Sequence, residues 1–192
     1  MTNFAAVLLA GGTSTRMGQS KAMLNYRGVP LWRRQLDTLS GLEPEELLIS
    51  AASGQEFLSG PWKVLRDSST GQGPLAGLSA ALRTVTAKHL LVLAVDMPEV
   101  TSEFLRLLLA EVEPNCGVVP ELDNFYLGTV AIYPRAILPM CEKLLVGQDR
   151  SFQMLVRQGL AEGLIKIRSV TENERHLFLN LNTPSDLLET DH

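Results

Sequence analysis

The first apolar segment of the chain and the connection that follows it restrict the fold more than any other stretch. Residues 4–9 are uniformly apolar and lack polar alternation, which is the pattern of a short strand covered on both faces. Gly11 and Gly12 follow, and their missing side chains let an anion approach the backbone N–H groups. Arg16 and Lys21 add positive charge within the same connection. The stretch therefore predicts a nucleotide phosphate loop after a buried strand.

This predicted loop differs from two common phosphate-binding loops. The chain has no glycine placed five residues before a Gly-Lys pair, as a Walker loop requires, and no G-x-G-x-x-G motif. A plain glycine turn followed by two solvated cations would explain Gly11 and Gly12 alone. The combination with Arg16, a Met-Gly pair and Lys21 favours phosphate binding instead.

Predicted strands and helices alternate along the rest of the chain. Apolar runs predict strands at residues 47–49, 62–65, 90–95, 117–120, 129–133, 164–168 and 177–181. Amphipathic or small-residue segments predict helices at residues 31–39, 75–82, 102–112, 135–145 and 151–158, and a polar loop is expected at 121–126. The alternation indicates a three-layer α/β fold with a mostly parallel, Rossmann-like sheet and helices on both faces. The length of 192 residues fits one domain, residues 1–192.

Composition excludes several classes of protein. The formal net charge of -4 argues against a nucleic-acid-binding protein, which would normally carry a basic excess. Cys116 and Cys141 are not spaced as a metal-binding pair, and the chain has 3 histidines, so a Cys/His metal cluster is not expected. The N-terminal apolar run is short and lacks a preceding basic region, which is unlike a signal peptide or membrane anchor. We expect a soluble protein of the reducing cytoplasm that contacts no membrane.

The most apolar run, residues 90–95, ends on an aspartate, Asp96. Ligands of open parallel sheets bind outside the carboxyl ends of the strands, so Asp96 should face the same crevice as the first glycine loop. A carboxylate at that point can hold Mg²⁺, which takes its other ligands from water and substrate phosphates. A helix-capping role for Asp96 is less favoured, because Pro98 and Thr101 already supply a helix start signal.

Four motifs together resemble those of one enzyme family. They are LAGG followed by x-S-x-R-M-G and K, the DS…GPLAG segment, VDMP around Asp96, and NLNTP beginning at Asn180. The pattern resembles the MobA-like nucleotidyltransferases, the family that contains molybdenum cofactor guanylyltransferase. The resemblance implies transfer of GMP from GTP to the terminal phosphate of molybdopterin, with Mg²⁺ or Mn²⁺ as cofactor. It also implies molybdenum-cofactor biosynthesis proteins and acceptor molybdoenzymes as partners.

The resemblance also implies roles for individual residues. It implies that Arg16, Lys21 and Asp96 take part in catalysis, and that Asp96 binds the metal. It implies second-substrate contacts by Arg150, Asn180 and Asn182. The implied nucleotide-binding residues are Leu9, Ala10, Gly11, Gly12, Lys21, Asp67, Gly77 and Asp96. Structural roles would also suit three of them: close helix packing for Gly77, a solvated loop for Arg150 and a strand end for Asn182. Asn180 is harder to explain without a ligand, because alternation along a strand at 177–181 would point both asparagines to one side.

Two stretches depart from the family pattern. Residues 49–52 read Ile-Ser-Ala-Ala where many guanylyltransferases carry an asparagine that contacts the nucleotide, and residues 125–128 replace a proline-centred segment near the pterin. LAGG with NLNTP still resembles the guanylyl branch more than the cytidylyl branch, whose loop usually reads LAAG. The alternatives are a cytidylyltransferase, a sugar-phosphate nucleotidyltransferase, and a non-catalytic accessory protein that binds nucleotide or molybdenum cofactor. The joint presence of Arg16, Lys21, Asp96 and Asn182 argues against the accessory protein.

Overall fold

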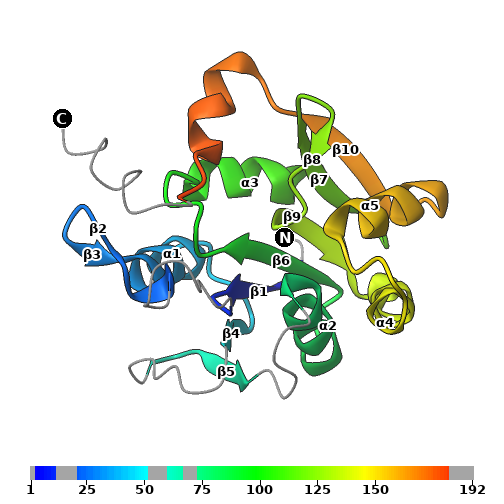
Figure 1. The fold of residues 1–192 in the computed structure, drawn as a ribbon, viewed down its shortest axis with the longest axis horizontal. Helices are drawn as coiled ribbons and strands as arrows, with labels where there is room; N and C mark the ends of the chain where they lie inside the picture. Colours follow the sequence, from blue (N-terminus) through cyan, green and yellow to red (C-terminus); the bar gives the residue numbers. More distant parts are fainter. Residues whose placement is uncertain (1–2, 12–20, 52–59, 67–72, 182–192) are drawn as a thin grey trace.

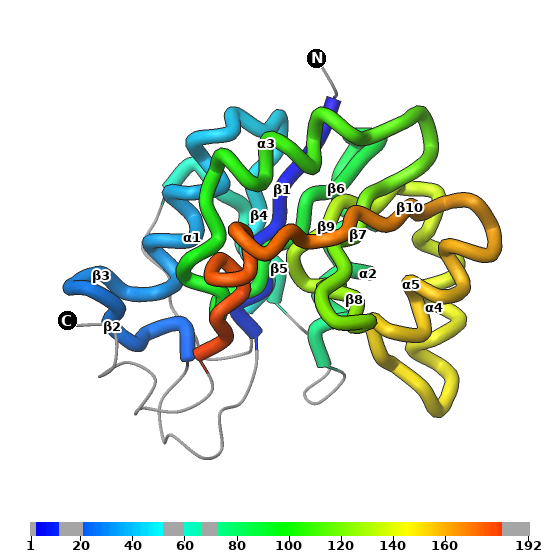
Figure 2. The backbone as a smooth tube through the Cα atoms, turned by 90° about the horizontal axis from the view of Figure 1, so that it is seen from above, coloured from blue at the N-terminus to red at the C-terminus, as the bar shows by residue number. Residues whose placement is uncertain are grey.

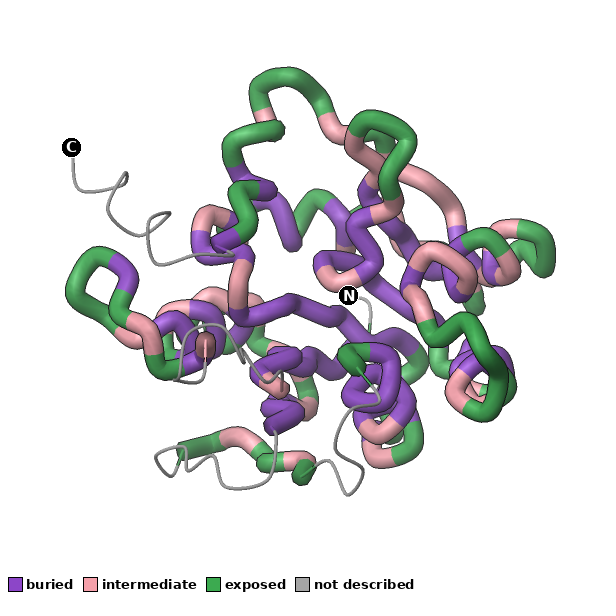
Figure 3. Tube along the Cα trace, in the orientation of Figure 1, coloured by how far each residue is buried: buried purple, intermediate pink, exposed green. Residues whose placement is uncertain are grey.

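The sheet is built around strand β1 (Phe4–Leu9), in which all six residues are buried. In the computed structural model, which describes residues 3–11, 21–51, 60–66 and 73–181, β1 lies between two parallel neighbours, β4 (Leu47–Ala51) and β6 (His89–Ala94). Both neighbours are also buried along their whole length (Figure 3). Uninterrupted apolar sequence is what a parallel strand covered on both faces requires, and the predicted strands at 4–9, 47–49 and 90–95 are confirmed.

The full strand order is β10-β7-β9-β6-β1-β4-β5, and β8 pairs with β7 at one side. The remaining strands are β5 (Lys63–Arg66), β7 (Gly117–Leu122), β8 (Phe125–Tyr126), β9 (Val130–Pro134) and β10 (Ile165–Ser169), with a separate hairpin of β2 (Asn25–Tyr26) and β3 (Val29–Pro30). Strand β9 runs antiparallel to both β6 and β7, whereas β10 is parallel to β7. The sheet is therefore mixed and mostly parallel.

Helices cover both faces of this sheet (Figure 1). The α-helices are α1 (Leu31–Ser40), α2 (Pro74–Thr84), α3 (Ser102–Glu111), α4 (Leu138–Val146) and α5 (Phe152–Ala161), and the 3-10 helices are η1 (Lys21–Met23), η2 (Arg135–Ile137) and η3 (Glu172–Phe178). Helices α1 and α3 pack in one apolar cluster, and α2, α4 and α5 pack in the other. Alternate residues of β1 contribute to the two clusters, so the expected three-layer α/β architecture is confirmed.

Two local predictions differ from the structure. The polar segment at 121–126 is a tight hairpin rather than a loop, because Leu122 pairs with Phe125 and both intervening residues, Asp123 and Asn124, have positive φ angles of 51° and 61°. Asp and Asn tolerate that conformation, which matches a type I′ hairpin turn. The strand expected at 177–181 is absent: 3-10 helix η3 ends at Phe178, and irregular chain follows.

The described part of the chain contains no helix with the length and apolar character that crossing a membrane would require.

Helix α2 approaches β1 and β4 closely at Gly77. A Cβ atom on Gly77 would lie 2.6 Å from Oγ of Ser50 and 3.0 Å from Cδ2 of Leu9, both shorter than ordinary contacts. Ser50 is itself buried, with 2% of its surface exposed. The missing side chain at Gly77 therefore sets the spacing between helix and sheet.

We predict that Gly77→Val lowers the free energy of unfolding by about 1–3 kcal/mol, the usual cost of overpacking a filled site. Chemical denaturation would measure the change. Ala80→Val, in the same helix at a half-buried position, is the matched control and should cost less. Equal stability of Gly77→Val and the parent protein would contradict the packing role.

His89, the first residue of β6, is buried with 4% of its surface exposed, and neither ring nitrogen has a hydrogen-bond partner within the described residues. Burial lowers the pKa of its imidazole, with a smaller contribution from the charge of Lys88, while the nearby main chain of Glu113 partly offsets the shift. The folded protein therefore binds a proton at His89 less readily than the unfolded chain does.

We predict that stability falls as the pH drops below about 6.5, because the unfolded chain then takes up a proton that folded His89 resists. Urea unfolding between about pH 7.5 and pH 5.5 would measure this loss. His89→Gln should flatten the pH dependence, whereas His176→Gln, at an exposed position, should leave it unchanged. An identical pH dependence in His89→Gln would exclude His89 as its source.

Candidate active site

The carboxyl ends of β1, β4 and β6 meet at one edge of the sheet because the three strands are parallel. Hydrogen bonding continues just beyond β1 and β6: Ala10 N donates to Ser50 O at 2.8 Å, and Val95 N donates to Leu9 O at 3.1 Å. These bonds fix the backbone on either side of the strand ends. The residues that follow the strands, Gly11 and Asp96, therefore start from rigid positions at the same edge.

Lys21 and Asp96 form an ion pair at this edge. Lys21 Nζ lies 3.2 Å from Asp96 Oδ2, and about a quarter of each side chain is exposed, 24% and 22% respectively. Lys21 is the first residue of η1, which is anchored by fully buried Ala22. The contact joins residues 75 positions apart, and the fold brings them together as the sequence analysis expected.

The ion pair faces a cavity of about 370 Å³. The cavity is lined by Leu9, Ala10, Gly11, Lys21, Pro74, Ala94, Val95, Asp96, Thr129 and Asn180. Six of the predicted site residues are in this set: Leu9, Ala10, Gly11, Lys21, Asp96 and Asn180. The walls thus combine apolar strand ends with one cation, one carboxylate and an amide.

Helix α2 begins at the cavity wall with Pro74 at its first position. Its N-cap, Gly73, has a φ of 71° and supplies no capping side chain, and the first turn contains no acidic residue. A helix N-terminus carries a partial positive charge and favours an anion. Together with Lys21, the start of α2 makes this side of the cavity suitable for phosphate.

Asp96 is suited to a hard divalent cation that is shared with a substrate. No group of three or more His, Cys, Asp or Glu side chains that could hold a metal occurs in the part of the chain that the structure describes. Mg²⁺ commonly binds one or two carboxylates and completes its shell with water and phosphate oxygens. A single cavity-facing carboxylate fits that mode and does not fit a metal site built from protein ligands alone.

Asn180 reaches the cavity from irregular chain that follows η3, rather than from a strand. Next to it, Leu181 N donates to Asp96 O at 3.0 Å, and Leu181 is buried with 2% exposed. The C-terminal part of the described chain is therefore tied to the main chain of Asp96. The strand whose alternation the sequence analysis used is absent here. Asn180 nevertheless lines the cavity, as expected for a residue of the site.

Thr129 and Pro74 are lining residues that the sequence analysis did not assign to the site. Thr129 lies just before β9, and its carbonyl accepts a hydrogen bond from Ala94 N at 2.9 Å. Because β9 is antiparallel to β6, its amino end lies at the same edge as the carboxyl end of β6. No local signal predicts that reversal of direction. Pro74 belongs to the GPLAG segment named in the sequence analysis. Its position before a small-residue helix was the signal that could have placed it at the site.

The other predicted site residues lie elsewhere. Gly77 is not among the lining residues and contacts Leu9 and Ser50 from behind the cavity wall. Arg150 is exposed between α4 and α5, where its Nε donates to Gly147 O at 3.4 Å, and it also does not line the cavity. Gly12, Arg16, Asp67 and Asn182 lie outside the described residues.

Comparison with known proteins places this chain in a family. The model of the MobA-like NTP transferase domain matches residues 6–163. A protein of Deinococcus radiodurans named "Probable molybdenum cofactor guanylyltransferase" is 34% identical over 98% of this chain and 94% of its own length, and one of Opitutus terrae with the same name is 32% identical over 95% and 92%.

The crystal structure of molybdopterin-guanine dinucleotide biosynthesis protein A from Archaeoglobus fulgidus has the same fold, with a TM-score of 0.74 and 23% identity over 96% of this chain and 95% of that one. The family model and the near full-length relatives indicate the same family. The chain belongs to the MobA-like NTP transferase family.

Proposed function

We propose that this nucleotidyltransferase is a molybdenum cofactor guanylyltransferase, which transfers GMP from GTP to the phosphate of molybdopterin. The carrying observation is the Lys21–Asp96 pair, which faces a cavity at the junction of the first loop, β6 and the start of α2. The curated relatives, similar over nearly the whole chain, support the guanylyl assignment.

The reaction replaces one phosphoanhydride (P–O–P) linkage with another. A terminal phosphate oxygen of molybdopterin attacks the α-phosphorus of GTP, the new P–O bond forms, and the bond between the α-phosphorus and the bridging oxygen breaks. Pyrophosphate leaves with the electron pair of that bond. Both reactants are anions, so binding must offset their repulsion and align attack. No serine or cysteine nucleophile is needed.

Lys21 can provide part of that charge without leaving Asp96. Its ammonium group has three donors, so one can remain on Asp96 Oδ2 while others bind phosphate oxygens. The partial positive charge at the N-terminus of α2 acts from another side of the cavity. Arg16, outside the described residues, is proposed to add a planar guanidinium to the same phosphates.

Asp96 is proposed to hold Mg²⁺, or Mn²⁺ in its place, with the remaining ligands supplied by water and phosphate. When bound, the metal would neutralise phosphate charge and fix the geometry of the triphosphate. Asp96 would orient the metal from a rigid backbone, because Val95 N bonds to Leu9 O and Leu181 N bonds to Asp96 O.

The acceptor side of the proposal involves Asn180 at the cavity wall. Asn182, in the same NLNTP motif, and Arg150, in the segment between α4 and α5, remain proposed contacts of the second substrate. Gly12, Asp67 and Gly77 remain proposed contributors to nucleotide binding, Gly77 through its close contact with Leu9. Ser50, which stands in the stretch where many relatives of the guanylyl branch carry asparagine, is buried and packed against α2. Recognition of guanine is therefore proposed to use other groups. We also propose cytoplasmic action alongside cofactor-biosynthesis proteins and acceptor molybdoenzymes.

The decisive experiment is a turnover assay with molybdenum-loaded molybdopterin, Mg²⁺ and GTP, CTP or ATP in parallel. We expect pyrophosphate and a dinucleotide product with GTP. Product with CTP instead would overturn the guanylyl assignment in favour of a cytidylyltransferase. GTP binding without product would favour an accessory protein or a different acceptor.

Removing the Asp96 charge should abolish turnover while the protein stays folded. Asp96→Asn keeps the size of the side chain but lacks the anionic oxygens that Mg²⁺ prefers. Pyrophosphate release and thermal unfolding would be measured together, with Glu142→Gln, at an ion pair between α2 and α4, as the surface control. A fully active Asp96→Asn enzyme would exclude the metal-binding role.

Lys21→Ala should weaken GTP binding or turnover by roughly 1.5–3 kcal/mol, the value of one charge-assisted hydrogen bond. The control is Lys63→Ala, which removes an exposed lysine from edge strand β5. Nucleotide titration and steady-state kinetics would separate the two effects. Unchanged binding together with an unchanged rate would refute a phosphate contact by Lys21.

A further inference from the structure

The segment that carries Asn180 is held in place by different contacts from those that hold the rest of the site. The residues after β1 and β6 follow directly from the sheet, whereas Asn180 follows η3 and belongs to no strand. Leu181 N makes one hydrogen bond to Asp96 O. The Leu181 side chain is also buried, in the apolar cluster that contains Leu177 and Phe178 of η3. These contacts hold Leu181, but Asn180 itself is exposed, so its position also depends on how η3 is held.

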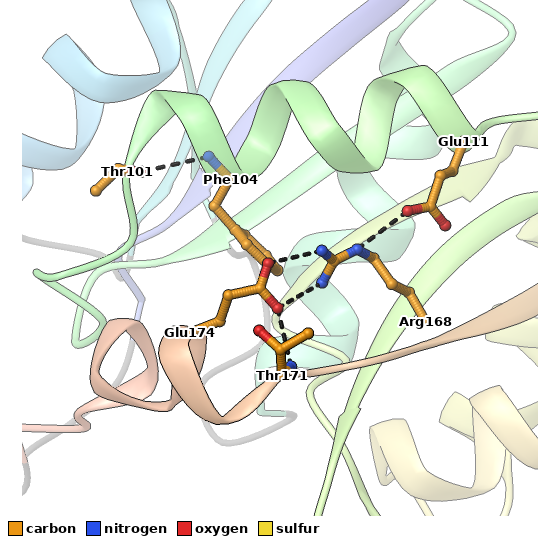
Figure 4. Close-up of polar contacts among 6 residues, drawn as sticks. All are labelled: Thr101, Phe104, Glu111, Arg168, Thr171 and Glu174. Atoms are coloured by element: carbon orange, nitrogen blue, oxygen red, sulfur yellow. Dashed lines mark hydrogen bonds and ion pairs between the residues drawn. The ribbon is translucent and has the colours of Figure 1, made fainter.

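Arg168, near the end of β10, binds the side chain of Glu174 in the first turn of η3 (Figure 4). Its Nη1 and Nη2 donate to Glu174 Oε2 at 3.0 Å and Oε1 at 2.6 Å, a bidentate contact. The two side chains are 14% and 17% exposed, so solvent screens this pair less than an ordinary surface pair. Its geometry therefore restricts both the position and the rotation of η3.

Two further contacts fix the guanidinium of Arg168. Its Nε donates to Glu111 Oε1 at 3.0 Å, at the end of α3. Its Cζ also lies 5.0 Å from the centre of the Phe104 ring, within the range of a cation–π contact. Arg168 thus joins three elements: β10, α3 and η3.

Glu174 also organises the start of η3. Its Oε2 accepts a hydrogen bond from Thr171 N at 2.9 Å, which completes a capping box. Its bond to Arg168 is the main cause that lowers the pKa of Glu174 to about 2. The carboxylate is charged throughout the neutral range, so the contact does not switch with pH under ordinary conditions.

The other end of η3 is held by an aromatic contact that starts from the same arginine. Phe104, under the Arg168 guanidinium, packs edge-on against Phe178, with ring centres 5.1 Å apart and planes at 85°. Phe178 is the last residue of η3, two positions before Asn180. The Arg168 contacts therefore act on both ends of the helix that leads into the cavity.

We propose that Arg168 is a positioning residue: through Glu174 and Phe104 it fixes η3, so that Asn180 stays at the cavity and Leu181 stays on the main chain of Asp96. The catalytic part rests on the proposed function, in which Asn180 contacts the second substrate. Arg168 itself is not among the residues that line the cavity, so it acts on substrate only through this segment.

The first test uses the Leu181 amide as a reporter that does not depend on activity. Arg168→Lys keeps the charge but loses the planar fork, and Glu174→Gln keeps the shape but loses the negative charge. We expect amide hydrogen exchange at Leu181 to accelerate about tenfold or more in both variants, while exchange at Leu93 in β6 stays the same. Arg83→Lys, at an exposed pair with Glu142, is the matched control. Unchanged exchange at Leu181 in both variants would overturn the proposal.

The second test is a double-mutant cycle in the turnover assay. Arg168→Lys alone should raise the KM for molybdopterin about tenfold, the size of one weakened hydrogen bond, and change the KM for GTP less than about twofold. In an Asn180→Ala background, Arg168→Lys should add little further loss, because the contact that it positions is already absent. Additive losses would show that Arg168 does not act through Asn180.

The two tests separate failure of the positioning role from failure of the proposed function. Faster exchange at Leu181 in a protein that makes no dinucleotide would leave the positioning role intact and reject the proposed reaction. Normal guanylyl transfer with unchanged exchange at Leu181 would support the proposed reaction and reject the positioning role. A general loss of stability without positioning would accelerate exchange at Leu93 as well as Leu181.

Discussion

The parallel pairing of β1 with β4 and β6 is the constraint on which the rest of the structure depends. Strand β1 runs between β4 and β6 (Figures 1 and 2). Phe4, Ala6 and Leu8 pack in one apolar cluster, while Ala5, Val7 and Leu9 pack in the other. A strand buried on both faces needs helices on both sides, and parallel neighbours need crossover connections. The carboxyl ends then meet at one edge, so the site arises from the same pairing that forms the core.

Electrostatics explains why a carboxylate belongs in a cavity suited to phosphate. Asp96 alone would repel a triphosphate, and the chain as a whole carries a formal net charge of -4. Lys21, at 3.2 Å, compensates Asp96 locally, and the start of α2 adds a partial positive charge at the cavity wall. An acidic residue is consistent with anion binding only where a cation lies between the two negative groups. Lys21, paired with Asp96 at the cavity, can supply that cation, and a divalent ion would add to it.

The sequence predicts the strands that have continuous apolar runs, whereas two elements with weaker local signals are not predicted. Continuous apolar runs identified β1, β4 and β6 because burial on both faces leaves no other pattern. The β7–β8 hairpin was missed although Asp123 and Asn124 are typical of such a turn. At the C-terminal end, the capping box of Thr171 and Glu174 was a local helix signal, but the apolar alternation at 177–181 was read as a strand instead.

The same distinction applies to the site. Gly11, Lys21 and Asp96 belong to recognisable motifs, and topology brings them together. Thr129 could not be found from sequence because its place depends on β9 running antiparallel to β6, a property of the assembled sheet. Arg168 and Glu174 are six residues apart, yet their effect on Asn180 also requires Phe104 and Phe178.

The two sides of the cavity are consequently stabilised by different kinds of interaction. The side with Leu9, Gly11 and Asp96 extends directly from the sheet, where main-chain hydrogen bonds do not depend on side-chain identity. The side with Asn180 has one main-chain hydrogen bond to Asp96, from Leu181 N. It otherwise depends on an ion pair, a capping box and an aromatic contact, which are specific to their side chains. Substitutions outside the cavity can therefore move the Asn180 side while leaving the sheet side in place. In a transferase with two substrates, that separation would let acceptor recognition diverge without rebuilding the nucleotide site.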